Sequence, residues 1–105
     1  MTFANVGTLQ TSPGRAGDLV AILTDPSMDL GAHGCLQYDV GVSVDDPDTV
    51  VVVERWESAE AHAASLSLPM VQDAIQRAGP LLTGQMGGHR FEVVGSPLGG
   101  PDDPR

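Results

Sequence analysis

Three stretches of the chain carry the hydrophobic pattern of β-strands. Residues 3–11 and 35–44 alternate between apolar and polar side chains, as strands with one buried face do. Residues 49–56 open with a run of β-branched side chains, which pack well on a pleated sheet and poorly in a helix. The Asp-Asp-Pro-Asp segment at 45–48 has turn chemistry and predicts a β-hairpin. A short last strand is predicted over residues 90–94.

Two other stretches place apolar residues at helical spacing. The first begins near Arg15 and ends before Pro26, because proline interrupts a helix. The second follows the hairpin: Ser58 is a candidate N-cap, Pro69 marks a break, and the helical pattern stops near Pro80.

The predicted order is β-α-β-β-α-β, which is the ferredoxin-like α+β arrangement, an antiparallel sheet with helices on one face. The other face then needs a second copy or a ligand to cover it. We predict one domain over residues 1–94. Residues 95–105 are rich in Pro, Gly and Asp and predict a flexible tail. The glycine-rich segment 84–88 does not open a helix after a strand, so we predict a mobile connection rather than a phosphate-binding loop.

Composition narrows the class of protein. Hydrophobic residues make up 41% of the 105, yet only four residues are aromatic, so the core must be aliphatic. The net charge of −9 argues against nucleic acid or an anionic membrane surface as a partner. The lone Cys35 permits no intramolecular disulfide, which favours a reducing, cytoplasmic setting. No signal-peptide pattern and no apolar run of about 18 residues is present, so we expect a soluble protein.

Several segments in order suggest a family. They are Gly-Cys-Leu-Gln-Tyr at 34–38, Asp-Asp-Pro-Asp at 45–48, Glu-Arg-Trp-Glu-Ser-Ala-Glu-Ala at 54–61, Ala-Ala-Ser-Leu-Ser-Leu-Pro at 63–69 and Arg-Ala-Gly-Pro-Leu-Leu at 77–82. With these segments the chain resembles the antibiotic biosynthesis monooxygenase (ABM) family, including its quinol monooxygenases, over residues 2–94.

The resemblance implies a dimeric ferredoxin-like α+β barrel. It also implies oxidation of quinol or anthrone-like aromatic substrates by dioxygen, with no cofactor, whether metal or flavin. Many family members place a His nine or ten residues after the Trp at the strand–helix junction and a second His after the following Pro. This chain has Ser65, Leu66 and Met70 at those places, so no catalytic His is carried over to them.

His62 is the candidate base for such chemistry. Cofactor-free oxygenation needs a substrate that becomes an electron-rich anion, and the protein must bind, deprotonate and stabilise it. Imidazole titrates near neutral pH, and His62 precedes Ser65 by one helical turn. Trp56, at the strand–helix junction, would stack on a planar ring. The plainer alternatives are a solvated helix histidine and a core tryptophan.

Three further residues are candidates for substrate binding. Asn5 shares a strand face with Phe3 and would donate a hydrogen bond to a substrate oxygen. The Tyr38 hydroxyl would do the same, unless Tyr38 is only a boundary residue of the sheet. Ser65 would at most orient a substrate, because no Ser-His-Asp spacing supports a hydrolase.

The remaining polar residues give weaker signals. Arg55 alternates with Trp56, and we predict a surface or interface pair between Arg55 and Glu54 or Glu57. The three histidines are too scattered for a metal motif, so no metal site is predicted.

The predicted function is a cofactor-independent monooxygenase that oxidises a quinol or polycyclic aromatic compound, with dioxygen as co-substrate and a homodimer as the assembly. Two alternatives stay open. One is a non-catalytic dimeric module that binds a small molecule or a protein. The other is haem binding or degradation, with His62 as the axial ligand.

Overall fold

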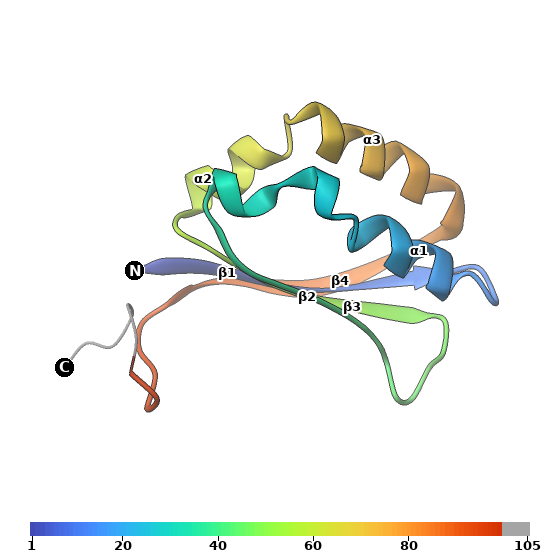
Figure 1. Ribbon diagram of the computed structural model, residues 1–105. Helices are drawn as coiled ribbons and strands as arrows, with labels where there is room; N and C mark the ends of the chain where they lie inside the picture. The colour runs from blue at the N-terminus through green and yellow to red at the C-terminus, as the bar shows by residue number, and fades with distance from the viewer. Residues whose placement is uncertain (100–105) are drawn as a thin grey trace.

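The structure is a computed structural model that describes residues 1–99, and it has two layers (Figure 1). The four strands form one antiparallel sheet in the order β2-β3-β1-β4. The strands are β1 (Thr2–Thr11), β2 (Cys35–Val42), β3 (Thr49–Trp56) and β4 (Leu82–Val93). The helices are α1 (Ala16–Leu23), α2 (Ala59–Ser65) and α3 (Pro69–Ala78), joined by the short 3₁₀ helices η1 (Pro26–Met28), η2 (Leu30–His33) and η3 (Gly79–Leu81). All helices cover one face of the sheet, so the predicted ferredoxin-like fold is confirmed.

The hairpin between β2 and β3 forms where the turn residues predict it. The Asp46 carboxylate accepts hydrogen bonds from the Asp48 backbone N–H at 3.0 Å and from the Thr49 hydroxyl at 2.8 Å. This side-chain turn fixes where β3 starts, and β3 has the predicted bounds.

β4 differs from the prediction. It is 12 residues long rather than a short strand near the end of the domain, and Gly84 to Gly88 lie inside it. The prediction of a mobile glycine-rich connection is therefore wrong. The physical reason is pairing: β4 runs antiparallel to β1, with Gly87 and Gly88 opposite Thr8 and Gly7 and a register shift between Leu9 and Thr11. These backbone hydrogen bonds outweigh the low strand propensity of glycine.

The hydrophobic core lies between the sheet and the helices. Its most buried side chains include Leu19 of α1 and Val50 of β3, both fully buried. No helix of residues 1–99 covers the opposite face, where Val51 and Val53 are half-buried. After β4, residues 95–99 form neither helix nor strand, and residues 100–105 of the predicted tail lie outside the described residues. Within residues 1–99, no helix is long and apolar enough to cross a membrane.

Candidate active site

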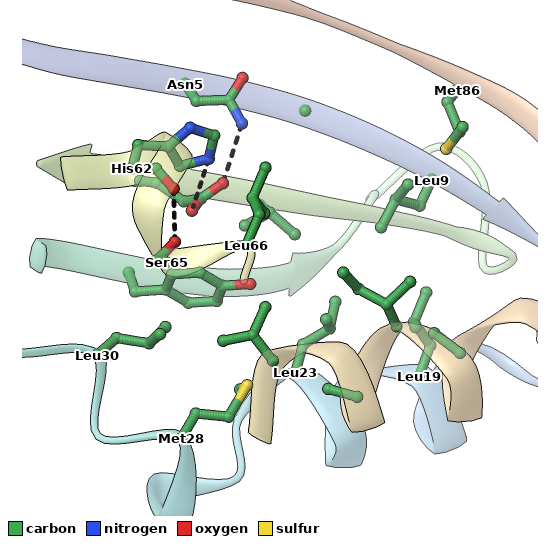
Figure 2. Close-up of a pocket in the computed structure, with 18 of the residues that line it drawn as sticks. Asn5, Leu9, Leu19, Leu23, Met28, Leu30, His62, Ser65, Leu66 and Met86 are labelled. Atoms are coloured by element: carbon green, nitrogen blue, oxygen red, sulfur yellow. Dashed lines mark hydrogen bonds and ion pairs between the residues drawn. The ribbon is translucent and has the colours of Figure 1, made fainter. Parts of the chain in front are cut away.

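A cavity of about 460 Å³ lies between the sheet and the helix layer. All five residues that the sequence predicted for a site line this cavity: Asn5, Tyr38, Trp56, His62 and Ser65. The rest of the lining is mainly aliphatic. Figure 2 shows the labelled polar residues at one end and Leu9, Leu19 and Leu23 toward the other.

Strand register explains why the polar residues meet. Tyr38 of β2 lies opposite Glu54 of β3, and Glu54 lies opposite Asn5 of β1. Residues opposite one another on neighbouring strands point to the same face. The three side chains therefore form one polar row across the sheet, on the face that the helices cover.

Glu54 is the centre of this row. Its Oε2 accepts a hydrogen bond from Asn5 Nδ2 at 2.9 Å, and its Oε1 accepts one from Trp56 Nε1 at 3.1 Å. The Nε2 atom of His62 lies 3.8 Å from Oε1 (Figure 2). The side chains of Glu54 and His62 are each only 12% exposed. A carboxylate and an imidazole thus share a largely buried end of the cavity, where charges interact more strongly than in water.

α2 places His62 in this position. Ser58 caps the start of this helix: its hydroxyl oxygen accepts a hydrogen bond from the Ala61 backbone N–H at 3.0 Å. The centroid of the His62 ring lies 5.3 Å from that of the Phe3 ring and 5.5 Å from that of the Trp56 ring. The His62 and Trp56 rings are packed edge-on. Its Nδ1 atom is buried and has no hydrogen-bond partner among the described residues. His62 is therefore held by aromatic packing, with Nε2 toward Glu54 and Nδ1 enclosed without a hydrogen-bond partner among residues 1–99.

Trp56 and Ser65 are tightly built into the fold. Trp56 is 1% exposed and donates its indole N–H to Glu54, so it positions the carboxylate. Ser65 is 3% exposed, and its hydroxyl donates a hydrogen bond to the His62 carbonyl oxygen at 2.6 Å.

The pKa of the Tyr38 hydroxyl is strongly shifted in the cavity. Burial raises the pKa of the Tyr38 hydroxyl well above its usual 10.0, and the nearby carboxylate of Glu54 raises it further. The phenol therefore stays protonated across the physiological range and remains a hydrogen-bond donor.

Sequence reasoning missed Glu54, which it treated as one possible surface partner of Arg55. The signal was available. Glu54 precedes Trp56 by two residues on a strand, so the two side chains point to the same face of the sheet. If Trp56 is buried on that face, Glu54 points toward the core as well.

Nothing among residues 1–99 brings three or more His, Cys, Asp or Glu side chains together as a metal site. His89 lies opposite Val6, on the sheet face away from the cavity, and His33 is exposed on η2. Of the histidines among the described residues, His62 alone lines the cavity.

Comparison with known proteins agrees with this architecture. The family model for antibiotic biosynthesis monooxygenases matches residues 2–77. A crystal structure of a candidate antibiotic biosynthesis monooxygenase from Chloroflexus aurantiacus is 37% identical, with a TM-score of 0.80, and the match covers 91% of this chain and 96% of that one. A second such candidate, from Deinococcus radiodurans, is 27% identical with a TM-score of 0.71, covering 91% and 95% of the two chains.

A Mycobacterium tuberculosis structure that is 23% identical shares the fold, with a TM-score of 0.76 over 92% of this chain and 99% of that one. No protein with a curated description matches the chain. The family model spans most of the chain and the Chloroflexus aurantiacus relative matches nearly all of it, so the protein belongs to the antibiotic biosynthesis monooxygenase family.

Proposed function

We propose that the protein is a monooxygenase that oxidises a small hydroxylated aromatic compound, of the quinol or anthrone-like class, with dioxygen. The observation that carries the proposal is the His62–Glu54 pair at the polar end of an otherwise apolar cavity. A volume of about 460 Å³ suits a ligand of a few rings, and apolar lining with few polar groups is typical of such sites.

The chemistry starts with a proton. His62 would accept a proton from the substrate, and the imidazolium that forms would lie 3.8 Å from the Glu54 carboxylate, which stabilises it by Coulomb attraction. The substrate anion is then electron-rich enough to pass one electron to dioxygen. No cofactor takes part in this proposal, because the substrate itself supplies the electrons.

For an anthrone-like substrate with an acidic CH₂ group, the remaining steps convert this group to a carbonyl. The substrate radical and superoxide combine to form a C–O bond, and protonation of the outer oxygen gives a hydroperoxide. Loss of water from it, with the second hydrogen of the CH₂ group, leaves a carbonyl. One atom of dioxygen ends in the product and the other in water.

The polar row would hold the substrate during these steps. The protonated Tyr38 hydroxyl would donate a hydrogen bond to the oxyanion of the deprotonated substrate, where negative charge develops. Asn5 Nδ2 already donates one hydrogen to Glu54 and has a second to offer.

Oxygen uptake by His62 variants tests the proposal. We expect His62→Ala to lower kcat by roughly a hundredfold or more, since general-base catalysis typically contributes at least that much. Glu54→Gln should also lower kcat, and the double variant should lose little more than the worse single one, because the two residues act as a unit. His33→Ala is the matched control, since His33 is exposed and does not line the cavity.

Unchanged turnover in a folded His62→Ala protein would remove His62 from the mechanism. Saturable quenching of Trp56 fluorescence by quinols or quinones without any oxygen uptake would favour the non-catalytic binding module instead. A Soret band on adding haem that disappears in His62→Ala would favour the haem alternative.

A further inference from the structure

One stretch of the cavity wall has no side chain. Along β1, Phe3, Asn5, Gly7 and Leu9 face the helix layer, since Phe3 packs on His62 and strand residues alternate. Asn5 and Leu9 both line the cavity at separate points along the strand (Figure 2), and Gly7, which lies between them, lines it too. The cavity therefore meets bare β1 backbone between its polar end and its apolar end.

The backbone does not require glycine at position 7. Gly7 has no positive φ, and a Cβ built on it would meet only the Gly87 carbonyl oxygen, at 3.7 Å, which is an ordinary contact. Gly88, its neighbour on β4, differs: it has a φ of 147°, and a Cβ there would collide with the Val6 carbonyl oxygen. Glycine inside a strand lowers stability, and it marks places where a ligand approaches the backbone. The space left in the cavity, rather than the fold, explains glycine at position 7.

We propose that Gly7 is a specificity-determining residue, and that its bare backbone is the floor on which a planar, fused-ring substrate lies flat. The oxygen-bearing edge of the substrate would point to Asn5 and Glu54, and its apolar rings would extend toward Leu9 and Met86, which lie opposite each other on β1 and β4. This inference rests on the proposed function for the chemistry of the substrate, and adds what selects its shape.

The dimensions of the strand favour fused rings over a single ring. Asn5 and Leu9 are four residues apart, which corresponds to roughly 13 Å at about 3.3 Å per residue. A side chain at position 7 would project into the middle of this span and lift a flat ligand off the strand. A single ring held at the polar end would extend less far along the strand and would overlap position 7 much less than three fused rings do.

Equilibrium binding without dioxygen tests this inference separately from turnover. The probes are 2,3-dihydroxyanthraquinone, whose three fused rings extend from a hydroxylated end, and hydroquinone, with one ring. Binding is followed by Trp56 fluorescence with inner-filter correction. We expect Gly7→Ala to weaken anthraquinone binding by roughly tenfold and Gly7→Val by more, because the added atoms overpack the slot. The affinity for hydroquinone should change less than about threefold, which corresponds to under about 1 kcal/mol of binding free energy.

The melting temperature shows whether a loss of affinity comes from the fold. Alanine is compatible with the backbone at position 7, so Gly7→Ala should keep or raise the melting temperature. Gly17→Ala is the matched control: Gly17 is exposed on α1, does not line the cavity, and a Cβ there meets no atom within 4 Å. It should leave both affinities unchanged.

Unchanged anthraquinone affinity in a folded Gly7→Val protein would overturn the assignment of Gly7, and so would the absence of saturable anthraquinone binding by the unaltered protein. Anthraquinone binding that the Gly7 variants weaken, without oxygen uptake in the presence of any quinol or anthrone, would contradict the monooxygenase proposal. It would still support Gly7 as the floor of the cavity.

Discussion

At the scale of single residues, Tyr38 offers a spectroscopic test because it is the only tyrosine in the chain. Burial raises its pKa above the usual 10.0, so the folded state holds the phenolic proton more tightly than the unfolded state. The resulting stability is complete below about pH 10 and is lost as the pH rises from there toward the folded-state pKa. We expect the phenolate absorbance of the folded protein to appear at higher pH than that of the urea-unfolded chain.

Tyr38→Phe should remove this part of the alkaline loss of stability while leaving the stability at neutral pH nearly unchanged. Equal phenolate midpoints in the folded and unfolded chains would show that Tyr38 is hydrated and would remove it as a protonated donor in the cavity.

Trp56 has a structural role that can be tested through the stability of the fold. It is 1% exposed and donates to the buried carboxylate of Glu54. Trp56→Phe keeps an aromatic ring but leaves Glu54 without this donor, and hydrogen bonds to charged groups contribute about 1.5–3 kcal/mol. We expect urea denaturation to show a loss of stability of at least that size, with part from the smaller ring. A loss below about 0.5 kcal/mol, the range of ordinary surface substitutions, would mean that Trp56 does not anchor the site.

The candidate site shows which residues sequence reasoning finds. Asn5 and Trp56 stand out as a polar residue on an apolar strand face and as the only tryptophan. Glu54 does not stand out, because most carboxylates are solvated. The spacing to Trp56 on β3 is a local signal for one of its contacts, whereas the contact of its other oxygen with Asn5 of β1 depends on the register between strands, a non-local property.

At the scale of elements, α2 depends on its N-cap. The Ser58 hydroxyl oxygen accepts the Ala61 N–H, and α2 has only seven residues, so few other bonds hold its start. We expect Ser58→Ala to lower the free energy of unfolding by about 1 kcal/mol, and Ser58→Asp to retain most of it, since aspartate also caps. Because α2 carries His62, Ser58→Ala should lower turnover as well. Equal stability of the two variants would mean that the cap contributes nothing.

β4 shows where local sequence signals fail. Gly84, Gly87 and Gly88 have low strand propensity, so the segment reads as a loop. In the structure it pairs with β1, and Gly88 lies opposite Gly7. The patterns of β1, β2 and β3 were sufficient for the fold because each strand carries its own local signal, which is alternation in β1 and β2 and a β-branched run in β3. The extent of β4 depends on its partner, which no local window contains.

At the scale of the whole molecule, the sheet face without helices carries apolar side chains. Val51 and Val53 of β3 and Val6 of β1 are half-buried there, and Phe91 of β4 is 48% exposed. Exposed apolar patches of this kind mark interaction sites in soluble proteins. We propose that a second copy of the chain covers this face, so that the protein is a homodimer in solution.

Sedimentation equilibrium of two valine variants tests the homodimer. We expect the mass of two chains for the unaltered protein and a shift toward one chain for Val53→Asp, because a carboxylate buried at the interface would lose its hydration without a partner. Val44→Asp makes the same change in the hairpin loop, at a residue that is 99% exposed, and should leave the dimer intact. Far-UV circular dichroism verifies that Val53→Asp folds. A single-chain mass for the unaltered protein at the concentrations of the activity assay would contradict the homodimer. The cavity would then act within one subunit, and the sheet face would be exposed to solvent or covered by another partner.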